Sequence, residues 1–245
     1  MKTNKKILIA ATICTLAGAV ITAAATSALY DASQKSVNTV TKTISPDILK
    51  INISTDAGKI KVTASDTDEI TLTYSEDGTT RYTVTEENYT LSVSPEKTKK
   101  SKAEWYDYYF SLDFHSNDVI LNVPQDFSAK TELNADFGNI DVNELSGSLT
   151  AECDYSDIKI NGGDFSKINL KSDCGNIKLT DVSGLDFDME CDLGDIRGTI
   201  AGKHSDYDIW AVSEVGKCNI APSADGPLRL SVQTNLGDID IHFTQ

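Results

Sequence analysis

The sequence has few of the residues, and none of the short motifs, on which most enzymes depend. It contains 3 His, 5 Cys and 2 Trp among 245 residues. No G-x-S-x-G, H-E-x-x-H or P-loop string occurs. The three histidines, His115, His204 and His242, lie in unrelated local contexts. No C-x-x-C pair supports a zinc site. We therefore expect a protein that is not an enzyme, with no catalytic residue and no cofactor.

Positive charge is also scarce. Of the 22 basic residues, Lys2, Lys5 and Lys6 fall within the first 30 positions, where no acidic residue occurs. The rest of the chain carries the other 19 basic residues and all 37 acidic ones, a net charge of −18. Such an acidic surface disfavours nucleic acid and anionic lipid as partners, and it favours cations and cationic peptides. We expect no nucleic-acid partner.

An uncharged run of 24 residues, 7–30, follows the N-terminal lysines. It is long enough to cross a bilayer as a helix, and the lysines would stay cytoplasmic. A cleaved signal peptide is the alternative, with small residues such as Ala23 and Ala25 at the cleavage site. Either interpretation exports the rest of the chain. We expect a single-pass cell-membrane protein with an extracytoplasmic C-terminal domain, or a secreted one. Residues 31–47 are polar and are predicted to be a spacer.

What the sequence does contain is one recurring phrase, D-x-G-[N/D/K]-I-x-[V/I/L]. The central Gly, which is Ser in one copy, stands at positions 58, 138, 156, 175, 194, 216 and 237. From position 138 onward the steps are 18, 19, 19, 22 and 21 residues. When this Gly is numbered 0, positions −5, −3 and −1 are apolar or small, and position +2 is Ile in all copies but one. Alternation of period two predicts strands, and the change of parity predicts a corner at the Gly.

The fold class predicted is all-β: a single-stranded β-solenoid (β-helix) over 48–245 with coils of about 18–22 residues. One N-terminal apolar helix, in residues 1–30, would precede it. The coils would stack in chain order, with positions −5, −3 and −1 facing the interior. The last coil, near Gln245, would form an open end. Residues 63–123 break the period, and they are predicted to be a strand-rich insertion.

Two strings carry a resemblance to a known family. They are Ile53-Ser54-Thr55-Asp56-Ala57-Gly58-Lys59-Ile60-Lys61-Val62 and Val119-Ile120-Leu121-Asn122-Val123-Pro124. Followed by the D-x-G-x-I coils, they resemble the bacterial β-strand-repeat family labelled "putative adhesin", over residues 48 to the C-terminus. The resemblance implies a surface or envelope location, a role as an adhesin or interaction module, and no catalytic residues.

Two alternatives to the adhesin interpretation stay open. Some relatives are tied to envelope-stress responses, which implies a component that senses or sequesters cationic antimicrobial peptides. The other alternative is a carbohydrate-active β-helix enzyme with carboxylates on one face. The partner is accordingly expected to be a surface ligand, either a glycan, a protein or a cationic peptide, in addition to the membrane itself.

The insertion contains the candidate binding residues. An aromatic cluster at 105–110 follows a lysine-rich stretch, and Trp105 and Tyr109 fall on the strand face opposite the alternating apolar residues. With Lys99 and Lys100 they are predicted to form a patch for the ligand. The alternative is that the aromatic residues pack in the core.

The Asp at position −2 recurs as Asp136, Asp154, Asp173 and Asp192. A ladder of carboxylates offers the oxygen ligands that calcium prefers, so these residues are weak metal candidates. The structural alternative is that each Asp accepts hydrogen bonds from N–H groups of its own corner. We assign no metal site.

The cysteines beyond residue 30 are predicted to be free thiols. Cys153 and Cys191 share column −3 but lie two coils apart, about 9–10 Å, which exceeds the reach of a disulfide. Cys174 and Cys218 fall in other columns.

Overall fold

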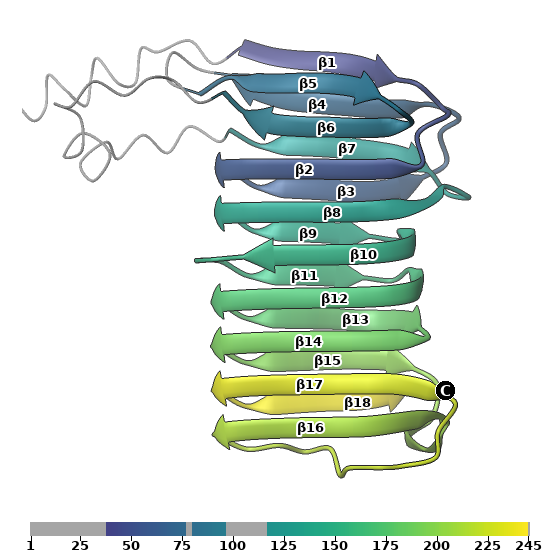
Figure 1. Ribbon diagram of the computed structural model, residues 1–245, viewed down its shortest axis with the longest axis vertical. Helices are drawn as coiled ribbons and strands as arrows, with labels where there is room; N and C mark the ends of the chain where they lie inside the picture. The colour runs from purple at the N-terminus through teal and green to yellow at the C-terminus, as the bar shows by residue number, and fades with distance from the viewer. Residues whose placement is uncertain (1–37, 77–79, 97–116, 245) are drawn as a thin grey trace, which may run out of the picture. The chain divides into compact units, whose positions relative to one another are not determined.

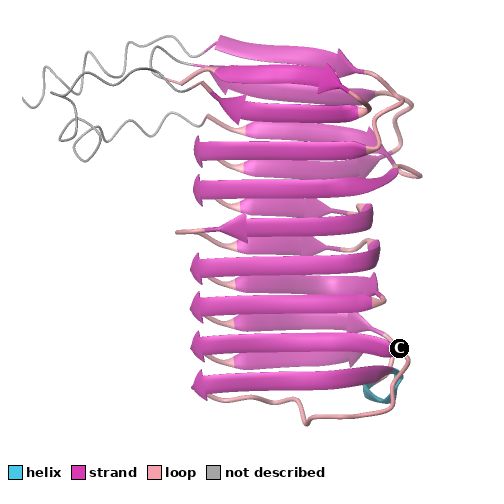
Figure 2. Ribbon diagram, viewed as in Figure 1, coloured by secondary structure: helices cyan, strands magenta, loops and turns pink. Residues whose placement is uncertain are grey.

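The computed structural model describes residues 38–76, 80–96 and 117–244, which form an almost entirely β unit (Figures 1 and 2). The exception is one short 3-10 turn, η1 (His204–Asp206). Within these ranges no helix has the length and apolar character needed to cross a membrane. The helix expected in residues 1–30 lies outside the described residues.

The strands form two facing layers that are stacked coil on coil. In spatial order, sheet A contains β1 (Asn38–Ile44), β4 (Ile70–Glu76), β7 (Val119–Pro124), β3 (Ile60–Ser65), β9 (Ile140–Asn143), β11 (Ile158–Asn161), β13 (Ile177–Gly184), β15 (Ile196–Ala201) and β18 (Ile239–Thr244). Sheet B contains β5 (Tyr82–Glu87), β6 (Thr90–Pro95), β2 (Lys50–Ala57), β8 (Ser128–Phe137), β10 (Ser146–Cys153), β12 (Asp164–Cys174), β14 (Asp186–Leu193), β17 (Leu228–Leu236) and β16 (Tyr207–Val215). Neighbouring strands are parallel except around β1, β4 and β5.

The register of the stack confirms the solenoid-like prediction. Position −5 forms one buried column through sheet B, of Ile53, Leu133, Ala151, Leu170, Met189, Val232 and the partly buried Ala211. Position +2 forms a column of six isoleucines through sheet A, and Cys218 bridges to the last of them, Ile239. Because each strand covers the apolar side chains of its neighbours, the core is continuous through all the coils.

The order of the coils differs from the chain order at both ends of the stack. The β2–β3 coil lies between β6–β7 and β8–β9, and the β17–β18 coil lies between β14–β15 and β16 (Figure 1). The prediction that the last coil forms an open end is therefore wrong. Beyond β17 lies β16, whose outer edge pairs with the following loop through the Ile209–Ser223 bridge.

The orientation of the side chains at position −1 also differs from the prediction. We expected it to face the interior with positions −5 and −3, yet Phe137, Leu193 and Leu236 are exposed. The physical reason is the narrowness of the corner. The small side chain at position −3 fills the interior there, and the Gly of one coil lies against the Gly carbonyl of the next. The chain turns before position −1 can enter the core.

The first strand falls where a spacer was expected. Residues 38–44 form β1, which pairs antiparallel with β4 over its whole length. Its side chains are mostly polar and exposed, so apolar alternation gave no signal there. The alternating runs at 70–74, 82–85 and 90–94 lie in β4, β5 and β6.

The four cysteines in the described residues are free thiols, as predicted. Cys153 and Cys191 are buried, and β12 separates their strands. Burial raises the pKa of Cys191 to about 11, so this thiol stays protonated at neutral pH.

Candidate functional site

A column of exposed apolar side chains follows the corner where the strands of sheet B end, at the left-hand arrowheads of Figure 1. It occupies position −1, and we call it the corner ladder. In stack order its members are Ala57, Phe137, Tyr155, Cys174, Leu193, Leu236 and Val215. The rings of Phe137 and Tyr155 stack with centroids 4.9 Å apart and planes 7° apart. At about 4.8 Å per coil the ladder is roughly 29 Å long, and contiguous exposed apolar surface of this kind marks interaction sites.

An acidic column lies directly beside the corner ladder, at position −2. It comprises Asp56, Asp136, Asp154, Asp173, Asp192 and Glu214, with Asn235 between the last two. Asp136, Asp154 and Asp173 are exposed, and their carboxylates make no hydrogen bond or ion pair with other described residues. Burial, and then the charges of Asp56 and Asp154, raise the pKa of Asp136. The column is therefore a row of like charges without internal counterions.

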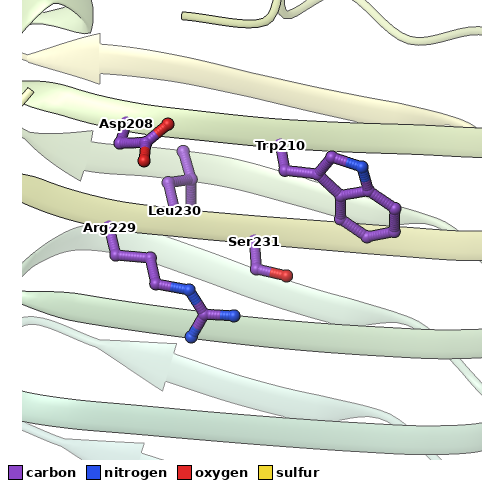
Figure 3. A pocket seen from close by; sticks show the side chains of 5 residues that line it. All are labelled: Asp208, Trp210, Arg229, Leu230 and Ser231. Carbon is purple, nitrogen blue, oxygen red and sulfur yellow. The ribbon is translucent and has the colours of Figure 1, made fainter. Parts of the chain in front are cut away.

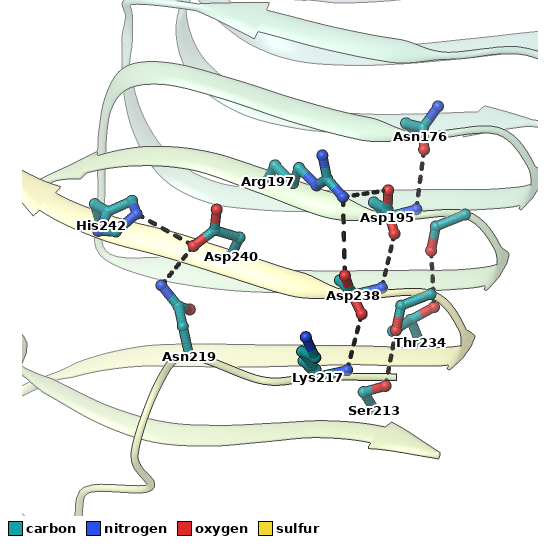
Figure 4. Close-up of polar contacts among 12 residues, drawn as sticks. Asn176, Asp195, Arg197, Ser213, Lys217, Asn219, Thr234, Asp238, Asp240 and His242 are labelled. Carbon is teal, nitrogen blue, oxygen red and sulfur yellow. Dashed lines mark hydrogen bonds and ion pairs between the residues drawn. The ribbon is translucent and has the colours of Figure 1, made fainter. Parts of the chain in front are cut away.

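The backbone of the corner is held by other residues than we predicted. The N–H groups expected to bond to the position −2 Asp donate instead to side chains at position +1 of the adjacent coil. Asp195 N–H donates to Asn176 at 3.0 Å, Asp238 N–H to Asp195 at 2.7 Å, and Lys217 N–H to Asp238 at 2.9 Å (Figure 4). We call this row the Asx ladder. Within the acidic column Asn235 donates to Asp192 at 2.9 Å, whereas Asp136, Asp154 and Asp173 have no structural role of this kind at the corner.

Position −3 braces the same corner from inside. The hydroxyl of Thr234 donates to the carbonyl oxygen of Gly194 at 3.0 Å, and that of Ser213 donates to Gly237 at 2.8 Å (Figure 4). The Cys191 thiol makes the equivalent contact with Gly175 at 3.1 Å. These bonds explain why position −3 holds small residues with a donor in most copies.

Two shallow hollows lie near the C-terminal end of the stack. The first, about 380 Å³, is on the outer face of sheet B between β16 and β17 (Figure 3). Its lining consists of Asp208, Trp210, Arg229, Leu230 and Ser231. Trp210 is 51% exposed. Neither its indole N–H nor the Asp208 carboxylate has a polar partner among the described residues.

The second hollow, about 360 Å³, lies over β18 and the segment after β16. Both of its carboxylates are already paired. Asp238 accepts from the backbone of Lys217 and lies 4.0 Å from Arg197. Asp240 accepts from Asn219 at 2.7 Å and lies 3.2 Å from His242 (Figure 4). This hollow serves the coil-to-coil contacts.

Residues 48–245 match the sequence model of the Toastrack DUF4097 family. The chain belongs to this family. The match confirms the resemblance to the β-strand-repeat family of unknown function.

Solved structures that match this chain at low identity include three bacterial proteins. One is a "putative cell adhesion protein" from Clostridium sporogenes, 15% identical to this Toastrack chain, with 85% of this chain and 100% of that one covered and a TM-score of 0.46. Another is a "putative adhesin" from Bacteroides fragilis, at 14% identity, 84% and 97% coverage and a TM-score of 0.34. A "putative lipid binding protein" from Parabacteroides distasonis shows 12% identity, 85% and 97% coverage and a TM-score of 0.23. None of the curated proteins matches.

The predicted site residues of the Toastrack chain fall into two groups. Trp105, Tyr109, Lys99 and Lys100 lie outside the described residues. The weak metal candidates at position −2 do line up in one column, and in the described ranges no three His, Cys, Asp or Glu residues are placed to hold a metal ion.

Sequence reasoning missed the corner ladder and Trp210. The sequence feature that could have indicated the corner ladder is the variety of residue types at position −1. Position −1 holds Ala, Phe, Tyr, Cys, Leu and Val, whereas the buried position +2 holds Ile almost throughout. Trp210 stands at position −6, which the alternation already places on the outer face.

Proposed function

We propose that this chain is an extracytoplasmic, non-enzymatic binding protein that engages a macromolecular ligand along the corner ladder, as an adhesin or interaction module. The observation that carries the proposal is the row of apolar side chains at position −1, in which Cys174 is half-buried and the large side chains are exposed, namely Phe137, Tyr155, Leu193, Leu236 and Val215. The fold does not need this row for its stability, because the buried columns at positions −5 and +2 already align the coils. The N-terminal lysines and the apolar run 7–30 support a membrane-anchored, exported location.

A non-enzymatic role is supported by the character of the surface. Both hollows are shallow, and the pKa of Asp136 is raised chiefly by burial and by its own column rather than by a partner in a cleft. The carbohydrate-active enzyme considered above would need a specific carboxylate pair across a substrate groove. The acidic column is instead a repeating row.

A second candidate is the sensing or sequestering of cationic peptides in an envelope-stress response. The acidic column favours it, because Asp136, Asp154 and Asp173 lie beside an apolar row and are not neutralised within the described residues. A basic amphipathic peptide could place apolar side chains on the corner ladder and cationic ones on the carboxylates.

One experiment tests both candidates. A deletion strain is complemented with the parent or with a ladder variant in which Phe137, Tyr155, Leu193 and Leu236 are replaced together by Ser. Both strains are scored for attachment and for susceptibility to a cationic peptide. We expect the ladder variant to attach no better than the deletion strain.

The matched control replaces Leu49, Tyr89 and Leu185 by Ser, because these side chains are 64%, 65% and 58% exposed but lie off the ladder. It should attach like the parent. Unchanged attachment together with altered peptide susceptibility would favour the second candidate. If the ladder variant matches the parent in both assays, the proposal fails.

A further inference from the structure

The hollow at β16 and β17 has features that the fold itself does not require. Trp210 is one of two tryptophans in the sequence, and it stands at an outward position of the terminal strand of sheet B. About half of its surface is exposed. In the same column on β17 lies Ser231, whose short side chain leaves the indole uncovered (Figure 3). A flat aromatic face is thus presented to solvent beside a polar hollow.

Two polar side chains lie near this indole on adjacent strands, because Asp208 of β16 pairs in register with Arg229 of β17. Arg229 is held in place because one guanidinium nitrogen bonds to Asp186 at 3.0 Å and the other lies 3.9 Å from Asp188. Asp208 stands two residues before Trp210 on the same strand face, about 7 Å along the strand. The carboxylate of Asp208 is unpaired among the described residues. The hollow therefore offers an open aromatic platform, a fixed donor and a free acceptor.

We propose that this hollow is a carbohydrate subsite for one ring of a neutral, β-1,4-linked hexopyranose chain. The C–H face of the sugar ring lies on the indole of Trp210. Arg229 donates to its hydroxyl groups and Asp208 accepts from them. A volume of about 380 Å³ accommodates such a ring, and the open sides let the chain continue in both directions. An extended β-1,4-linked glycan can lie along the outer face of the sheet, whereas a curved glycan bends away from it.

The charges select the class of sugar. Three carboxylates, those of Asp186, Asp188 and Asp208, lie near two cations, Arg229 and Lys167, whose ammonium is 3.6 Å from Asp186. The cluster keeps a net negative charge, which repels an anionic sugar. A small cation is disfavoured as well, because the guanidinium of Arg229 lines the hollow and one open indole is not an aromatic cage. The subsite is separate from the corner ladder, and it does not depend on the function proposed for that ladder.

The test follows the fluorescence of Trp210 in the full-length chain carrying Trp105→Phe, which leaves Trp210 as the sole tryptophan. The probes are cellotetraose, chitotetraose, maltotetraose, trigalacturonate and tetramethylammonium. We expect cellotetraose or chitotetraose to change the emission saturably, with a Kd of about 0.1–1 mM. The curved maltotetraose should bind more weakly than either. Trigalacturonate and tetramethylammonium should have no effect.

Variants locate the site, with binding measured by calorimetry. Trp210→Ala should weaken binding at least about ten-fold, whereas Trp210→Tyr, which keeps an aromatic face, should stay within about three-fold. Asp208→Asn and Arg229→Gln should each weaken it by about three- to ten-fold. Leu236→Ser, on the corner ladder, should bind the sugar like the parent. The carbohydrate proposal and the ladder proposal can therefore fail independently of each other.

Several outcomes would overturn the inference. The first is the absence of a saturable signal with either β-1,4-linked probe up to about 10 mM. The second is a Trp210→Ala variant that binds as tightly as the parent. The third is tighter binding of trigalacturonate, tetramethylammonium or maltotetraose than of the β-1,4-linked probes. Should Trp210→Ala fail to fold by circular dichroism, the contrast between Trp210→Tyr and Asp208→Asn decides the matter.

Discussion

Gly194 stands at a corner where consecutive coils approach closely. Its φ is +152°, and a Cβ added there would lie 2.2 Å from the carbonyl oxygen of Gly175. The conflict is with backbone, so no side chain can rotate away to relieve it. We predict that Gly194→Ala lowers the free energy of unfolding by about 2–4 kcal/mol, measured by urea denaturation.

Ser156 provides the matched control, because it occupies the same column with a side chain and without a positive φ. Ser156→Ala removes one exposed hydroxyl contact, to the carbonyl oxygen of Tyr155, and should cost less than about 1 kcal/mol. Equal losses in the two variants would show that the corner tolerates a Cβ anywhere, and that the glycine is not needed for the close approach.

The strands and their register could be predicted from the sequence because each buried column repeats the same type of residue at the same position of every copy. Position +2 is buried wherever it is Ile, and only the copy with the exposed Cys218 departs from this, so the repeated Ile is enough to align sheet A. Position −1 breaks the alternation because the corner begins one residue before the Gly, a geometric fact that hydropathy does not encode. The corner ladder could therefore be identified only once the turn was seen. The patch around Trp105 was predicted from composition, and it lies outside the described residues.

The Asx ladder is the element that replaces the corner role expected of the acidic column. Asp195 accepts the N–H of Asp238 at 2.7 Å, and its own N–H donates to Asn176 at 3.0 Å. Asp195→Ala leaves the Asp238 N–H without its partner, and we predict a loss of about 1–2 kcal/mol in unfolding free energy. Asp195→Asn keeps an acceptor oxygen, and it should recover most of that loss.

One control separates this effect from the ion pair that Asp195 forms with Arg197 at 2.7 Å. The pair is solvent-exposed, so Arg197→Ala should cost no more than about 0.5 kcal/mol. A loss in Arg197→Ala as large as that in Asp195→Ala would mean that the ion pair, and not the backbone contact, stabilises this corner.

For the whole molecule, the informative feature is the order of the coils. The copies of D-x-G-x-I place the same residue types in the same columns, so the apolar pattern fits any stacking order. What differs is the connection. Steps of 18 and 19 residues join spatial neighbours, whereas the 22-residue step leads from β14–β15 to β16, which lies one coil further away. The sequence could therefore predict the stack and its columns, but not the position of its last two coils.

Cross-linking tests this order directly. Glu190 on β14 pairs with Gln233 on β17, and Gln233 pairs in turn with Val212 on β16. Adjacent parallel strands place such residues about 4.8 Å apart, within reach of a disulfide, whereas Glu190 and Val212 are about 9.6 Å apart. With Cys218, the exposed thiol, replaced by Ser, we predict that the pair Glu190→Cys and Gln233→Cys forms a disulfide on mild oxidation. The pair Glu190→Cys and Val212→Cys should remain reduced. Mass spectrometry of the digested protein identifies the linked peptides. The reverse result would place β16 directly on β14, and it would restore a stack in chain order with β17 and β18 at its end.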